Sequence, residues 1–145
     1  MEEKESLDTS LGVLLGQICR LHHSKFHSMF AKIGLHRGQH RILFILWKKD
    51  GVTQKEIVEE LSLAPATITD AVQRMEKIGL IERRNDGEDQ RVIRVYLTES
   101  GRQFQKEVDE TFNNLEEEIF KNFTFEEKII LRRLFIQIRD NLKYT

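Results

Sequence analysis

Apolar residues recur at helical spacing over three long stretches of this chain. One stretch covers residues 7–33, and the other two cover 99–123 and 124–143. At the start of the last stretch, Thr124 and Glu127 have the spacing of a capping box, in which each side chain accepts a hydrogen bond from the backbone N–H of the other residue. We therefore expect one long helix near the beginning of the chain and two at its end.

Three shorter helices are predicted between the long ones, over about 37–49, 54–61 and 65–78. Thr53 and Glu56 have the spacing of a second capping box, which opens the middle helix. The last of the three begins with proline, which suits a first helical turn because its missing N–H would have no partner there. Two short helices joined by a tight turn are the pattern of a helix-turn-helix.

The pattern changes from helical to strand-like after residue 79. The segments Leu80–Arg84 and Val92–Leu97 predict two strands, the second of them rich in β-branched residues. Asn85, Asp86 and Gly87 lie between the strands and tolerate positive φ, so we expect a tight hairpin turn there. A helix-turn-helix followed by a β-hairpin is a winged helix.

The predicted fold class is therefore mainly α with a small β-hairpin (α+β). Residues 36–98 form the winged helix-turn-helix, and residues 1–35 and 99–145 supply the flanking helices. The long helices carry more apolar surface than a small winged helix can bury alone, so we predict a two-fold homodimer.

The composition is that of an ordinary soluble globular protein, with 39% hydrophobic and 32% charged residues in a chain of 145. No apolar run approaches the roughly 20 residues that a membrane span needs, and the acidic start lacks the features of a signal peptide. The single cysteine, Cys19, excludes an intramolecular disulfide and suits a reducing compartment. We expect a cytoplasmic protein without a membrane partner.

The net charge of −1 by itself argues neither for nor against a nucleic-acid partner. The chain does lack the domain-wide basic surface typical of nucleic-acid-binding domains, and this counts against DNA binding. Positive charge is nonetheless concentrated in residues 81–94, which contain Arg83, Arg84, Arg91 and Arg94. An enzyme is not expected, because the chain has no recognisable nucleophile–base pair, phosphate-binding glycine loop or paired acidic motif. No cofactor is predicted.

The predicted helix 65–78 carries the candidate base-reading side chains, since the second helix of a helix-turn-helix lies in the major groove of double-stranded DNA. Its candidate DNA contacts are Pro65, Ala66, Thr67, Thr69, Asp70, Gln73, Arg74 and Lys77. Threonine and glutamine can read base edges, whereas arginine and lysine suit phosphates. A solvated polar face would give the same pattern. The position of this helix between a capped helix and a hairpin favours the DNA contact.

Asp70 is unexpected on such a face, because phosphates repel a carboxylate. It would be tolerated if it accepted a hydrogen bond from cytosine, or if it paired with Arg74 one helical turn later, and we favour the ion pair.

The hairpin supplies the second set of candidate DNA contacts, namely Arg83, Arg84, Asp89 and Arg91. An arginine at the tip of a hairpin can enter the narrow minor groove, where the potential is most negative. Asp89 is spaced to hold the Arg91 guanidinium in position. An ordinary exposed hairpin remains the alternative.

Several runs of residues together resemble the MarR family of winged helix-turn-helix transcriptional regulators. These runs are Leu61–Thr69 (LSLAPATIT), Arg74–Arg84 (RMEKIGLIERR), Asp89–Arg91 (DQR) and Leu97–Gly101 (LTESG). The resemblance implies a regulator, most simply a repressor, that binds a pseudo-palindromic operator as a homodimer and is released by a small-molecule ligand. It further implies that residues 1–35 and 99–145 form the dimerisation region.

Three positions depart from the pattern of this family. Ala64 stands where the family often has a capping serine or aspartate, Asp70 replaces a frequent basic residue, and Gln90 replaces the first of two wing arginines. By the same resemblance, Arg91 is the remaining wing arginine. These departures bear on the operator sequence and the affinity more than on DNA binding itself.

All five histidines lie between residues 22 and 40, and two pairs of them are spaced four residues apart, as in some metal sites. We favour core or exposed histidines over a metal site. The resemblance implies that a small aromatic or anionic effector binds between the dimer helices and the winged helix. Candidate ligand residues there are Arg20, His23, His27 and His40.

Two further functions stay open at this point. A winged helix can serve as a protein–protein interaction module without specific DNA binding, and relatives of this kind include metal- or redox-responsive regulators. For Cys19, which lies on a largely apolar stripe, we favour buried packing over peroxide sensing.

Overall fold

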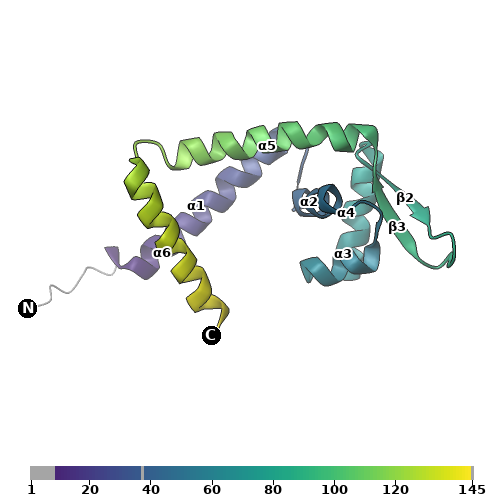
Figure 1. Cartoon of the computed structure of the whole chain (residues 1–145), viewed down its shortest axis with the longest axis horizontal. Helices are drawn as coiled ribbons and strands as arrows, with labels where there is room; N and C mark the ends of the chain where they lie inside the picture. The colour runs from purple at the N-terminus through teal and green to yellow at the C-terminus, as the bar shows by residue number, and fades with distance from the viewer. Residues whose placement is uncertain (1–8, 37, 145) are drawn as a thin grey trace, which may run out of the picture. The chain divides into compact units, whose positions relative to one another are not determined.

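The computed structural model of the chain describes residues 9–36 and 38–144. These residues fall into two compact units that meet between Thr111 and Phe112. The first unit contains four helices, a small sheet and the first part of a fifth helix, and the second contains the rest of that helix and the last one (Figure 1). The expectation of a mainly helical fold with a small β-hairpin is confirmed, and a short third strand adds to the hairpin.

The helices are α1 (Leu11–Lys32), α2 (Gln39–Lys48), α3 (Gln54–Leu61), α4 (Pro65–Lys77), α5 (Glu99–Ile119) and α6 (Phe125–Lys143). The strands are β1 (Val52–Thr53), β2 (Ile81–Asn85) and β3 (Ile93–Leu97). Every predicted helix and both predicted strands are present. The predicted helix starts near residues 7 and 37 lie outside the described residues.

Local capping explains where several helices begin. The Ser10 hydroxyl accepts a hydrogen bond from the first turn of α1. Both predicted capping boxes are confirmed: Thr53 and Glu56 cap each other at the start of α3, and Thr124 and Glu127 do so at the start of α6. Each box satisfies two backbone N–H groups that a helix cannot satisfy internally.

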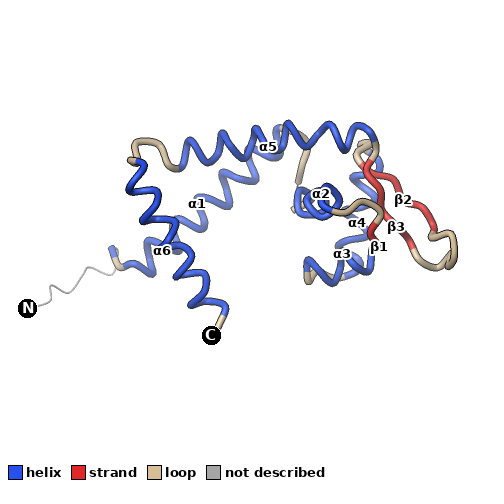
Figure 2. The backbone as a smooth tube through the Cα atoms, in the orientation of Figure 1, coloured by secondary structure: helices blue, strands red, loops and turns tan. Residues whose placement is uncertain are grey.

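The sheet has the order β1-β3-β2, and β3 pairs antiparallel with both neighbours (Figure 2). Val95 of β3 lies opposite Val52 of β1 and opposite Arg83 of β2. β1 has only two residues, so no alternation of apolar and polar positions could have revealed it.

The predicted tight turn at Asn85–Gly87 is wrong. Asn85 still belongs to β2, and the strands are joined by the longer loop 86–92, in which neither Asp86 nor Gly87 adopts positive φ. Asp86 shapes this loop through its side chain instead. Its Oδ2 accepts hydrogen bonds from the backbone N–H groups of Glu88 and Asp89, both at 3.2 Å.

The core of the winged helix is formed by apolar side chains from α2, α3, α4 and the sheet. Its buried members include Ile42, Leu43, Leu46, Ile57, Ile68, Val72, Met75, Ile81, Val95 and Leu97. The residues from α4 recur at helical spacing, so burying them leaves the opposite face of that helix exposed. The fold thus determines which side of α4 is open to a partner.

The described part of α6 contains no buried residue. Its exposed large apolar side chains are Phe125, Ile129, Ile130, Leu134, Phe135, Ile136, Ile138 and Leu142. α1 likewise exposes Leu11, Val13, Leu14, Ile18 and Leu21. None of the described helices has both the length and the apolar character needed to cross a membrane.

Candidate nucleic-acid interface

The open face of α4 presents most of the side chains predicted to contact DNA. Seven of the eight are exposed, namely Pro65, Ala66, Thr67, Asp70, Gln73, Arg74 and Lys77, and Thr69 is half-buried. Pro65 is the first helical residue, and Ala64 before it supplies no side-chain cap. Small side chains at this end let the helix backbone approach a groove closely.

Asp70 and Arg74 form the predicted ion pair, with Arg74 Nε 3.2 Å from Asp70 Oδ2. Both side chains are more than half exposed, at 59% and 55%. An exposed pair four residues apart on a helix contributes only a few tenths of a kcal/mol, about 0.3–0.5. Arg74 can therefore exchange this carboxylate for a phosphate at little cost.

Thr69 differs from the other side chains of this face because its hydroxyl is already hydrogen-bonded within the protein. It donates to the Pro65 carbonyl oxygen at 3.0 Å and accepts from Gln54 Nε2 at 3.2 Å. Sequence reasoning missed Gln54, which lies at the start of α3. A contact between two different helices leaves no local sequence pattern.

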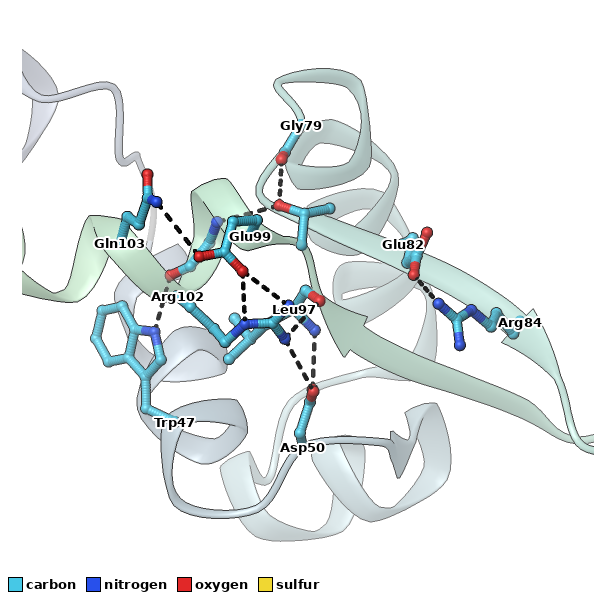
Figure 3. A network of polar contacts seen from close by, with 11 residues as sticks. Trp47, Asp50, Gly79, Glu82, Arg84, Leu97, Glu99, Arg102 and Gln103 are labelled. Atoms are coloured by element: carbon cyan, nitrogen blue, oxygen red, sulfur yellow. Dashed lines mark hydrogen bonds and ion pairs between the residues drawn. The ribbon is translucent and has the colours of Figure 1, made fainter.

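Two of the predicted wing contacts are occupied by neighbouring carboxylates. The Arg83 guanidinium lies 3.0 Å from Glu76 Oε1, and the Arg83 backbone N–H donates to Glu76 Oε2 at 2.9 Å. These bonds join β2 to α4 and lower the pKa of the Glu76 carboxyl. Arg84 pairs with Glu82 (Figure 3). Its guanidinium also lies 4.7 Å from the centre of the Tyr96 ring.

Arg91, in contrast, projects from the loop 86–92 with its side chain 92% exposed. Its Nε lies 3.2 Å from Asp89 Oδ1, and the same oxygen accepts the Arg91 backbone N–H at 3.0 Å. The predicted pairing of Asp89 with Arg91 is confirmed. The pair fixes the base of the side chain and leaves the guanidinium open to solvent.

The loop that carries Arg91 is fixed at its base by a second pair. Arg94 Nε lies 2.6 Å from Asp86 Oδ1, and Arg94 Nη1 donates to the Gly51 carbonyl at 2.9 Å. The hydrogen bond from Arg94 and the two backbone N–H donors hold the pKa of the Asp86 carboxyl below its ordinary value. Arg94 thus connects the wing to the segment just before β1.

The start of α5 is hydrogen-bonded to the winged helix by a polar network (Figure 3). Asp50 Oδ1 accepts from the Leu97 backbone N–H at 2.8 Å, and Trp47 Nε1 donates to the Gly101 carbonyl at 3.0 Å. A Cβ atom at Gly101 would lie 2.1 Å from the Leu80 carbonyl oxygen, so only glycine fits this close approach. The run Leu97–Gly101 is therefore a structural junction.

The candidate ligand residues lie in α1 and α2, and the structure brings three of the four together. His23 and His27 are in edge contact, with ring centres 4.2 Å apart. The His40 ring lies 4.7 Å from that of Phe26, and burial, with help from the charges of Arg41 and His27, lowers the pKa of His40 to about 4. Arg20 is exposed on α1.

Neither a metal site nor a buried cysteine is found in these helices. Within residues 9–36 and 38–144, no three histidine, cysteine or acidic side chains are grouped so that they could hold a metal ion. Cys19 is exposed, so the expectation of buried packing is wrong for the single chain. The apolar stripe on which it lies is itself largely uncovered.

The second unit contains a groove of about 760 Å³ that the sequence did not suggest. Its apolar lining residues are Phe120, Leu131, Phe135 and Ile136. Charged side chains of opposite sign flank them, with Glu116 and Glu117 on α5 and Lys128, Arg132 and Arg139 on α6. Apolar lining with acidic residues from one helix and basic residues from the other suits an amphipathic protein segment.

Comparison with known proteins gives a consistent result. The family model described as the MarR family matches residues 35–93. The HTH-type transcriptional regulator TtmR of Methylorubrum extorquens (strain PA1) is 29% identical over 74% of this chain, a match that spans only 55% of TtmR. The uncharacterized HTH-type transcriptional regulator YwoH of Bacillus subtilis (strain 168) is 31% identical, and the match covers 83% of this chain and 88% of YwoH.

The fold is also similar to that of a solved structure. The crystal structure of the PcaV transcriptional regulator from Streptomyces coelicolor aligns with a TM-score of 0.81 and 20% identity. The alignment covers 94% of this chain and 100% of that one. At this level of identity the likeness concerns the fold.

Proposed function

Because the chain belongs to the MarR family of winged helix-turn-helix transcriptional regulators, we propose that it represses genes by binding a pseudo-palindromic operator as a homodimer. In this proposal α4 lies in the major groove, and Arg91 of each wing enters the adjacent minor groove. Acting on operator DNA, the protein would work in the cytoplasm, as the sequence analysis expected.

The observation that carries the proposal is the composition of the exposed face of α4. Buried Ile68, Val72 and Met75 fix the orientation of the helix, so that Gln73 and Arg74 point away from the core. A glutamine can make paired hydrogen bonds to an adenine edge, and an arginine can do so to guanine or reach a phosphate. The wing adds an exposed arginine held by Asp89.

The exposed apolar faces of α1 and α6 support the homodimer. A two-fold axis would place the same apolar side chains of two copies against each other, and removing them from water would drive association. Phe135 and Ile136 of the exposed face of α6 also line the groove between α5 and α6.

We further propose that a small aromatic anion releases the protein from DNA by binding near Arg20, His23, His27 and His40. The support is chemical: imidazole rings packed on phenyl rings suit an aromatic ligand, and a cationic side chain nearby suits its carboxylate. Titration with benzoate, followed by the imidazole NMR signals, checks this site. Unchanged signals at millimolar benzoate would contradict it.

Selection of binding sequences from a random DNA pool tests the function. The wild-type protein should enrich an inverted repeat, and Gln73→Ala should lose the preference at one position of each half-site, at a cost of about 1–3 kcal/mol per contact. Gln105→Ala is the matched control, because Gln105 is exposed on α5 and distant from α4 in sequence.

Two outcomes would contradict the proposal. Enrichment of no sequence by the wild-type protein would favour the alternative of a protein–protein interaction module. An inverted repeat that Gln73→Ala selects as strictly as the wild type would mean that the assigned face of α4 does not read bases.

A further inference from the structure

The hydrogen bonds of Thr69 restrict what this side chain can offer to a base. A hydroxyl has one proton to donate and two lone pairs. The proton is donated to the Pro65 carbonyl oxygen, and one lone pair accepts the amide N–H of Gln54. The hydroxyl thus has no proton left to donate to a base and only one further lone pair that could accept, whereas the whole methyl group is available for an apolar contact.

Gln54 carries a buried polar group that is not fully hydrogen-bonded, which is unfavourable for a residue whose role is only to stabilise the fold. Its Nε2 donates to Thr69, but its Oε1 is buried and has no hydrogen-bond partner among the described residues. An unpaired buried carbonyl oxygen weakens the folded state relative to an apolar side chain of the same size. A gain in stability therefore does not explain Gln54, and its hydrogen bond to Thr69 is the contact through which it can act.

We propose that Gln54 is a positioning residue that fixes Thr69 so that α4 reads thymine through the Thr69 methyl group. Thymine is the base that presents a methyl group in the major groove, and apolar contact with it discriminates thymine from cytosine at the same position. This inference rests on the proposed placement of α4 in the major groove. It assigns polar base reading to Gln73 and apolar base reading to Thr69.

The test uses the operator selected by the wild-type protein, in which each thymine is replaced in turn by deoxyuridine, which lacks only the methyl group. At one symmetric position, the replacement should lower wild-type affinity about three- to fivefold per half-site, the effect expected for one buried methyl. Thr69→Val keeps a methyl at this position. Valine has one strongly preferred χ1 rotamer in a helix whereas threonine divides between two, so this variant needs no Gln54 hydrogen bond to hold it and should keep the sensitivity. Thr69→Ser lacks the methyl and should bind both DNAs equally.

Gln54→Met separates positioning from stability, because methionine matches the length of glutamine and removes the amide. Its Tm should equal or exceed that of the wild type, whereas its sensitivity to deoxyuridine should fall. In a Thr69→Val background, which has no hydroxyl to hold, Gln54→Met should leave base preference unchanged. Gln105→Met, on exposed α5, controls for the introduction of a methionine.

Each other outcome overturns a defined part of the account. Loss of preference in Thr69→Val with retention in Thr69→Ser would show that the hydroxyl reads the base. Equal effects of Gln54→Met in both backgrounds would show that Gln54 does not act through Thr69. A selected operator without any deoxyuridine-sensitive thymine would refute this inference alone, whereas failure to select an operator would refute the proposed function as well.

Discussion

The arginines of the hairpin fall into two groups according to their partners. Arg83 pairs with Glu76, and Arg94 pairs with Asp86. Both pairs connect different segments of the fold, so the two positive charges are largely neutralised within the protein. Arg91 also has a carboxylate partner, but almost all of its side chain remains exposed. These three arginines look alike in the sequence, and the structure gives them different roles.

Substitution of Asp89 tests whether the wing is organised for DNA. If Asp89 orients Arg91, Asp89→Ala should weaken operator binding by about 0.2–1 kcal/mol, the value of an exposed ion pair. Arg91→Ala should weaken binding to operator and unrelated DNA alike and reduce the slope of log affinity against log salt by about 1. Fluorescence anisotropy titrations at several salt concentrations measure both effects.

Glu88→Ala is the matched control for Asp89→Ala. It removes the same charge from the same loop, but the bonds to Arg91 come from Asp89. Removing a carboxylate near DNA should, by electrostatics alone, tighten binding. If Asp89→Ala tightened binding to the same extent as Glu88→Ala, the two carboxylates would act only through their charge, and Asp89 would not orient Arg91 for DNA.

The pairs that sequence reasoning found are those close in the chain. Asp70 with Arg74 and Asp89 with Arg91 could be predicted from spacing on a helix and in a loop. The contact between Gln54 and Thr69 could not, because the fold of α3 against α4 creates it. The same holds for Glu76 and Arg83, which are seven positions apart with a helix end and a strand start between them.

At the scale of elements, α1 and α2 are joined by contacts between aromatic rings. Phe26 and Phe30 of α1 stack with centres 4.3 Å apart, and the His40 ring of α2 lies against both, at 4.7 and 5.6 Å. Phe44 continues the contact along α2, with its ring centre 5.6 Å from that of His40. A neutral imidazole suits these apolar neighbours better than a charged one.

This packing predicts a loss of stability in mild acid. The pKa of His40 is about 4 in the folded chain against an ordinary 6.5, so the unfolded chain binds the extra proton between these values. The contribution of neutral His40 to the free energy of unfolding is complete above pH 6.5 and falls as the pH drops toward 4. Between pH 6.5 and 5.5 it should amount to at most about 1 kcal/mol, because solvent reaches part of the ring.

Thermal unfolding of wild type and His40→Phe over this pH range measures the effect. Phenylalanine keeps the ring contacts and cannot be protonated, so the variant should lose less Tm than the wild type on acidification. His36→Gln is the control, because His36 is exposed in the loop before α2. Parallel Tm curves for wild type and His40→Phe would contradict the role assigned to this histidine.

The elements themselves were largely predictable, and the exceptions have physical causes. Capping boxes and apolar spacing are local, so the helices starting at Gln54 and Phe125 were placed correctly. The two-residue β1 exists because β3 offers it a partner, which no local pattern reveals. The hairpin turn was misjudged because Asp86 bonds through its side chain, whereas a turn residue was expected to act through positive φ.

At the scale of the whole molecule, the proposed DNA binding depends on the association of two copies of the chain. α1 and α6 each expose a row of large apolar side chains, and the described part of α6 has no buried residue. Such surfaces are typical of interfaces rather than of independent monomers. The exposure of Cys19 has the same explanation, since its stripe on α1 lacks a cover in the single chain.

The mass of the protein–DNA complex tests the central claim most directly. Sedimentation or native mass spectrometry should give a dimer for the free protein at micromolar concentration, and two chains on one duplex that carries the selected inverted repeat. A stable monomer, or one chain per duplex with no preference for the inverted repeat, would contradict the account.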